Sequence, residues 1–108
     1  MLDLSQIVGF DWDEGNRLKS IERHSVSQPE AEQVFADERL MIIGDVKHSQ
    51  DEARYHALGR TIEGRPLHVT FTLRDSQQRI RIISARNMSR KERGLYEQEA
   101  SADSPLSE

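Results

Sequence analysis

The feature that most limits what this chain can fold into is a pair of strand-like segments joined by a short polar turn. Apolar and polar side chains alternate strictly from Leu67 to Arg74, and a second segment, rich in isoleucine, runs from Arg79 to Ala85. Alternation with a period of two is typical of a β-strand with one buried and one polar face. Because only a short polar segment separates the two, we predict a β-hairpin, and hence a fold built around an antiparallel sheet.

Helix signals lie on both sides of this hairpin. A first helix is expected to run to about Arg23, with Leu18 and Ile21 on its buried side. Capping boxes, in which a serine and a glutamate three residues apart satisfy each other's backbone donors, open a second helix at residues 27–30 and a C-terminal helix at residues 89–92. We therefore expect two N-terminal helices and one C-terminal helix.

The remaining segments complete an α+β fold. Strands are expected at residues 40–43 and 54–58, and residues 10–12 form either a short strand or an apolar anchor. Sequential strands with short connections favour an antiparallel sheet of about four strands, with helices covering one face. The expected organisation is a flexible N-terminus at 1–9, a single domain at 10–99 and a disordered, acidic tail at 100–108.

Positive charge is concentrated in the second half of an acidic protein. The net charge of the 108 residues is −4, yet the stretch from Arg54 to Arg93 holds nine arginines and one lysine against three acids. Arg79 and Arg81 are two residues apart, so they share one face of a strand. Paired across the hairpin with Arg74, they would form a cationic sheet surface suited to phosphate. The alternative is a solvated face with scattered salt bridges.

The four histidines are the candidate acids and bases, because histidine titrates near neutral pH. His24 follows Arg23 at the end of the first expected helix, and His48 lies in a polar loop before residue 54. RNA can be cleaved without a metal if one group takes the proton of the 2′-hydroxyl and another protonates the leaving oxygen. The alternative is that each histidine is structural. No zinc-like spacing appears, so neither a metal nor another cofactor is expected.

Composition excludes several classes of protein. The chain has no cysteine, so disulfides and thiolate metal sites are excluded. No apolar stretch approaches the length of a membrane span, and no phosphate-binding glycine loop or nucleophile elbow is found. We expect a cytoplasmic protein that makes no membrane contact.

Several motifs resemble the BrnT toxins of bacterial type II toxin–antitoxin systems. The resemblance spans about residues 10–97, and it rests on Phe-Asp-Trp-Asp at 10–13, the Gly-Arg step at 64–65 and, most specifically, Ile-Arg-Ile-Ile-Ser-Ala-Arg at 80–86 followed by Arg-Lys-Glu-Arg at 90–93. It implies a RelE-like fold and a ribonuclease that halts translation. It also implies a BrnA-like antitoxin, a ribbon-helix-helix protein through which operator DNA would be reached. A dimer or a toxin–antitoxin hetero-oligomer is the implied assembly.

The resemblance also implies roles for particular residues. The implied catalytic residues are His24, His48, Arg81 and Arg86, and the implied arginine of the Gly-Arg turn is Arg65, which would bind RNA. The expected cationic face adds Arg74 and Arg79 as RNA-binding residues, and Arg23 joins them as the cation beside His24. Relatives usually have a glycine where this chain has Ser25, at the expected end of the first helix. Two other functions fit the same residues: a non-catalytic module that binds nucleic acid or antitoxin, and an adaptor whose cationic face docks an acidic partner.

Overall fold

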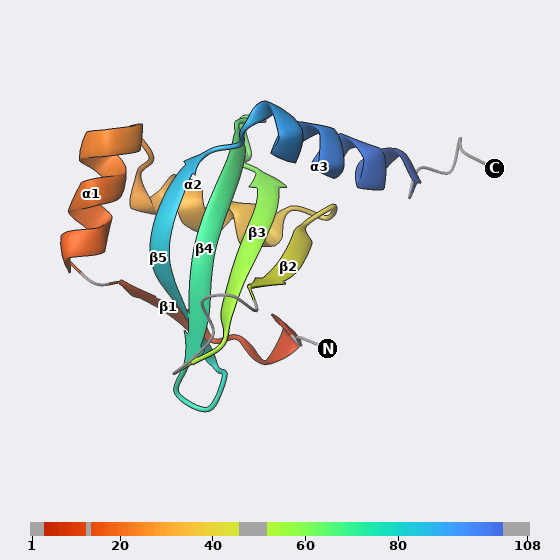
Figure 1. Ribbon diagram of the computed structural model, residues 1–108. Coiled ribbons are helices and arrows are strands. Elements are labelled where there is room, and N and C mark those ends of the chain that lie inside the picture. The colour runs from red at the N-terminus through yellow and green to blue at the C-terminus, as the bar shows by residue number, and fades with distance from the viewer. Residues whose placement is uncertain (1–3, 13, 46–51, 103–108) are drawn as a thin grey trace.

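A five-stranded mixed sheet forms the centre of the computed structural model, which describes residues 4–12, 14–45 and 52–102 (Figure 1). In chain order the elements are η1 (Leu4–Gln6), β1 (Gly9–Trp12), α1 (Glu14–His24), α2 (Gln28–Gln33), η2 (Val34–Ala36), β2 (Met41–Asp45), β3 (Arg54–Arg60), β4 (Pro66–Arg74), β5 (Arg79–Asn87) and α3 (Arg90–Ala102). Across the sheet the strands follow the order β1-β5-β4-β3-β2.

The predicted hairpin is confirmed as β4 and β5, but the sheet is not purely antiparallel. β2, β3, β4 and β5 pair antiparallel, whereas β1 lies parallel to the first half of β5, with Gly9 opposite Arg79. The expected RelE-like arrangement of two N-terminal helices and four antiparallel strands is therefore wrong in detail. Residues 10–12 belong to a fifth strand, β1, which pairs with β5. This pairing joins residues that are far apart in the sequence, so no local pattern predicts it.

The main core lies between the sheet and the second helix. α2 and η2 run across the far face of the sheet in Figure 1, and they bring the fully buried Ala31 and Val34 against β3, β4 and β5. Phe35 meets Phe71 edge to face, with ring centroids 5.0 Å apart. The capping box at residues 27–30 is present as predicted. It starts α2 where its apolar side can reach the sheet.

The first helix is less buried than the sequence suggested. α1 packs beside β5, beyond the end of β1 (Figure 1). Ile21, expected on the buried side, is 41% exposed, so that prediction is wrong. The prediction for Leu18 lies outside the described side chains.

The last helix, α3, crosses one end of the sheet and projects beyond β2 (Figure 1). A second small core of Leu58, Met88 and Tyr96 anchors it, and the Tyr96 hydroxyl donates a hydrogen bond of 2.6 Å to the Asp37 carboxylate. Burial, with this bond, raises the pKa of Tyr96 to about 12. α3 continues to Ala102, so residues 100–102 are helical and not part of a disordered tail. Residues 103–108 lie outside the described part.

The N-terminal segment is also more ordered than expected. Residues 4–9 form η1 and the start of β1, and both Leu4 and Ile7 pack against the main core. The Val8 amide donates to the carbonyl oxygen of Gln78. This apolar packing differs from the flexible segment expected at 1–9, of which residues 1–3 lie outside the description.

Candidate functional site

The polar face of the central strands is covered, not open. His68, Thr70 and Thr72 of β4 are 7%, 8% and 1% exposed, although each lies on the polar side of the alternation. The Thr72 hydroxyl donates to the carbonyl oxygen of Ala53 at 2.6 Å, just before β3 begins. The expectation of an open polar sheet surface is therefore wrong in its centre.

The arginines of this face are held by the protein's own acids. Ion pairs join Arg74 to Glu52 at 3.2 Å, Arg79 to Asp75 at 3.1 Å and Arg81 to Asp11 at 3.2 Å. All three pairs lie at the β1 end of the hairpin, around the turn of residues 75–78. The expectation of one continuous, uncompensated cationic surface is wrong. Exposed pairs of this kind contribute little free energy, so a phosphate can still compete for the guanidinium groups.

Arg65 is a structural residue that ties three segments together. Its guanidinium donates to the carbonyl oxygens of His24 and Ser25, to the carboxylate of Glu30 and to the side-chain oxygen of Asn87. Hydrogen bonds from Ser27 and Arg65 lower the pKa of Glu30. Because most of its donors are occupied, Arg65 fixes the end of α1 next to the end of β5.

The histidines expected to act in catalysis are placed very differently. His24 is exposed at the last residue of α1, and Arg23 beside it is also exposed. Ser25 follows with a φ of 56°, in the left-handed conformation that usually ends a helix with glycine. His48 lies outside the described residues. The Arg65 bonds bring His24 to the same end of the sheet as Arg86.

A pocket of about 370 Å³ lies between β2, β3, β4 and α3. Two imidazoles line it: His56 of β3 and His68 of β4 are stacked, with ring centroids 4.9 Å apart and planes at 29°. Arg86 of β5 and Lys91 of α3 also line the pocket. The two cations and two histidines thus surround one cavity.

A hydrogen-bond chain fixes the two imidazoles. The Nε2 atom of His56 lies 2.8 Å from the Asp45 carboxylate, so we assign its proton to that nitrogen. The Nδ1 atom of His56 then accepts from the Nε2–H of His68 at 2.9 Å and from the Thr70 hydroxyl at 3.2 Å. Burial, together with the positive charge of Arg86, lowers the pKa of His68 to about 4. His68 is therefore neutral at physiological pH.

Arg86 and Glu92 close the pocket with a bidentate pair. Both Nη atoms of Arg86 lie 2.8 Å from oxygens of Glu92, and Glu92 also accepts from the Ser89 amide in the predicted capping box. Burial alone would raise the pKa of Glu92, but these hydrogen bonds outweigh it and lower the pKa to about 2. The site therefore keeps one fixed anion beside Arg86.

Comparison with known proteins identifies the relatives of this chain. The family described as "Ribonuclease toxin, BrnT, of type II toxin-antitoxin system" matches residues 12–92. The chain belongs to the BrnT family. The crystal structure of the Brucella abortus ribonuclease toxin BrnT resembles this structure with a TM-score of 0.59 at 20% sequence identity, covering 77% of this chain and 99% of that one. No curated protein matches the sequence. Membership of the BrnT family makes this a ribonuclease toxin of a type II toxin–antitoxin system, which implies an antitoxin partner and an RNA target.

The sequence pattern of this BrnT toxin did not single out His56 and His68, which are stacked and line the pocket. His56 and His68 were counted among the four histidines, but neither was selected. The register places His56 opposite Thr70 and His68 opposite Leu58, so both imidazoles share one face of adjacent strands. The sequence alone does not give the register of residues 54–58 against residues 67–74, and this register is what brings the two imidazoles together.

Two further observations concern classes of site. Within residues 4–12, 14–45 and 52–102, no group of three or more His, Asp or Glu side chains is placed to hold a metal ion. In the same ranges, none of the helices of this BrnT toxin is long and apolar enough to cross a membrane.

Proposed function

We propose that this BrnT toxin is a metal-independent endoribonuclease that stops translation and is neutralised by a BrnA-like ribbon-helix-helix antitoxin. The observation that carries the proposal is the pocket in which Arg86 and Lys91 meet two histidines, His56 and His68. Operator DNA would be reached only through the antitoxin, within a toxin–antitoxin hetero-oligomer.

The proposed reaction is attack of a ribose 2′-hydroxyl on the adjacent phosphate. Arg86 would stabilise the charge that develops on the phosphorane, since a guanidinium presents parallel donors to two oxygens. His24, exposed on the same end of the sheet, would transfer a proton, as would His48. Glu92 and the carbonyl oxygen of Asn87 together take up three of the five donors of Arg86 and fix the guanidinium. This supports the role, because no bond to another described residue involves the Nε–H or the second Nη2 hydrogen, which can donate to a phosphate.

The other arginines are proposed to hold the rest of the RNA chain. Arg81 lies five residues before Arg86 on β5, which at 3.3 Å per residue is about 16 Å away. It would therefore bind the backbone at some distance from the reacting phosphate, together with Arg74 and Arg79, while Arg23 would contact RNA beside His24. The hydrogen bonds of Arg65 support an indirect role, since it orients the segment that carries His24.

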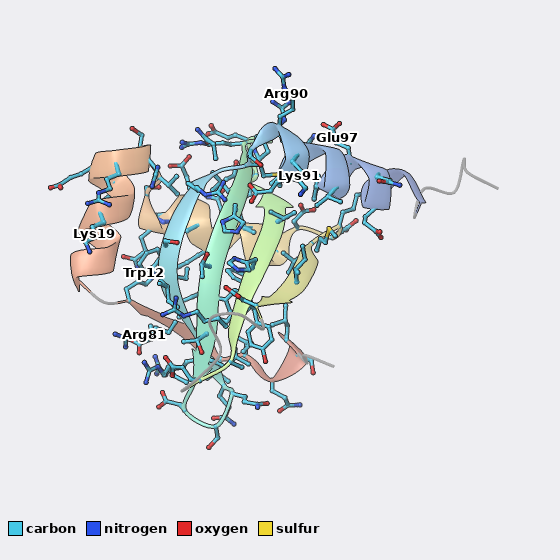
Figure 2. All side chains as sticks on the ribbon, viewed as in Figure 1. Trp12, Lys19, Arg81, Arg90, Lys91 and Glu97 are labelled. Carbon is cyan, nitrogen blue, oxygen red and sulfur yellow. The ribbon has the colours of Figure 1, made fainter. Side chains whose placement is uncertain are left out.

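Cleavage of purified RNA in the presence of EDTA tests the proposal. We expect product ends with a 2′,3′-cyclic phosphate, and a loss of about 10²–10⁴-fold in rate for His24→Ala, as is usual for a general acid or base. Lys19→Ala, an exposed change on the same helix (Figure 2), is the control and should cleave normally. Loss of cleavage in EDTA would refute metal independence, and full activity of His24→Ala would remove His24 from the site.

A second candidate is a non-catalytic module that binds RNA or antitoxin. The observation that favours it is that Arg74, Arg79 and Arg81 are all paired with acids, which leaves less uncompensated charge for catalysis. Such a module would bind RNA with a strong salt dependence but yield no product ends. The same cleavage assay therefore distinguishes the two candidates.

A further inference from the structure

We propose that the pocket between β2, β3, β4 and α3 holds one unpaired nucleobase of the RNA and so determines which sequences are bound. This inference rests on the proposed function, because it concerns the substrate of the same site. It adds a base-binding role for Ile43, His56 and Leu95, none of which takes part in the proposed proton transfers.

The first observation is apolar surface that two different elements contribute to the pocket. Ile43 of β2 and Leu95 of α3 are each 38% exposed, although both are large hydrophobic side chains, and both line the cavity. Leu58 of β3, which is fully buried, also lines the cavity. Two exposed apolar side chains facing a shared cavity form a slot for a ligand with apolar faces.

The second observation is the aromatic wall. The imidazoles of His56 and His68 are stacked, and the bonds to Asp45 and Thr70 fix the orientation of His56. Histidine rings are among the groups on which proteins stack unpaired RNA bases. Because both rings are held by hydrogen bonds before any ligand arrives, little side-chain entropy is lost when a base packs against them.

The third observation is the size and charge of the pocket. Its volume of about 370 Å³ lies within the range of sites for small molecules, and so suits a single base with its sugar. Lys91 is exposed at the rim, whereas the neighbouring Arg90 points away from the sheet (Figure 2). Among the described residues Lys91 makes no ion pair, so its ammonium group is available for the phosphate attached to that base.

The ligand must be single-stranded. In a duplex the base faces are stacked on one another and cannot enter a side pocket. An antitoxin side chain is the competing occupant, but the apolar and aromatic walls next to the Lys91 ammonium group match the faces and phosphate of a nucleotide better. A protein side chain would bring an apolar group without the anion.

An abasic scan tests the proposal. A fluorescent single-stranded RNA, 2′-O-methylated throughout so that no 2′-hydroxyl can attack, is made as a series in which each position in turn lacks its base. We expect one position at which removing the base weakens binding to the wild-type protein by at least about fivefold, the loss typical of one stacked base. For Leu95→Ala that position should lose its effect, and Ile43→Ala should repeat the result.

Ile62→Ala is the matched control. Ile62 is 83% exposed in the turn after β3 and does not line the pocket, so this variant should keep the wild-type pattern. Circular dichroism establishes that each variant is folded. Leu95 lies on an exposed face of α3, so its truncation leaves a testable protein even if Ile43→Ala does not fold.

The possible outcomes separate this inference from the proposed function. A wild-type protein that shows the abasic effect but cleaves no RNA would refute the nuclease and retain the base pocket. Cleavage without any abasic effect would refute the pocket alone. If Leu95→Ala leaves the RNA pattern unchanged but weakens binding of the antitoxin, the pocket belongs to the protein partner and the inference is overturned.

Discussion

Replacing His68 by glutamine should remove most of the loss of stability on mild acidification. The pKa of His68 is lowered from 6.5 to about 4 in the folded protein, chiefly because burial disfavours the charged ring. The unfolded chain takes up this proton as the pH falls through 6.5, whereas the folded protein resists it until about pH 4. The contribution of neutral, buried His68 to the free energy of unfolding is therefore fully present above pH 6.5 and is lost progressively towards pH 4.

The magnitude follows from the two pKa values. Between pH 7 and pH 5, proton uptake by the unfolded state alone should cost the wild-type protein about 2 kcal/mol of unfolding free energy. Glutamine can still donate to the Nδ1 atom of His56 but does not titrate, so the His68→Gln variant should lack this component. Urea unfolding at several pH values measures the difference.

Thr70→Val is the matched control for this prediction. This substitution disturbs the same hydrogen-bond network, because it removes the hydroxyl that donates a hydrogen bond to His56, but it leaves His68 able to titrate. Its stability should be lower at every pH, with the wild-type slope retained. An equal slope for wild type and His68→Gln between pH 7 and pH 5 would refute the assignment of a neutral, buried imidazole.

Two substitutions test the packing around Gly59 and the backbone conformation of Ser25. Gly59→Ala should destabilise the protein by about 1–3 kcal/mol in urea unfolding, because the added Cβ would lie 2.8 Å from a methyl group of Val34. Gly44→Ala is the control and should cost far less, because no atom lies within 4 Å of its added Cβ. Ser25→Gly should stabilise the protein by about 1 kcal/mol, because glycine adopts the left-handed conformation at φ 56° without strain, while Ser25→Ala should give no such gain. A destabilised Ser25→Gly would show that the Ser25 side chain contributes more than its strain costs.

The sequence alone predicted those parts of the fold that depend on neighbouring residues. The β4–β5 hairpin follows from alternation with a period of two, and the capping box at Ser27 follows from a serine and a glutamate three residues apart. Both are present. The parallel pairing of β1 could not be predicted, because it depends on contacts between Asp11 and Arg81, 70 positions apart. Local signals therefore describe the elements better than their arrangement.

The candidate site was predicted less well than the fold, and for the same reason. Arg86 was selected from its motif and does line the pocket. The pairing of Arg81 with Asp11 and the meeting of His56 with His68 arise only when strands from separate parts of the chain align. Charge counted along the sequence overestimates free charge in space, since several of the acids that neutralise the arginines, namely Asp11, Glu30 and Glu52, come from outside the cationic stretch.

The position of β1 at the edge of β5 also bears on how the toxin is made. On the ribosome, the N-terminal strand emerges long before the strand with which it pairs. Its hydrogen-bonding edge must stay without that partner until residues 79–87 have also left the exit tunnel. The five-stranded sheet therefore cannot be completed before β5 has been synthesised.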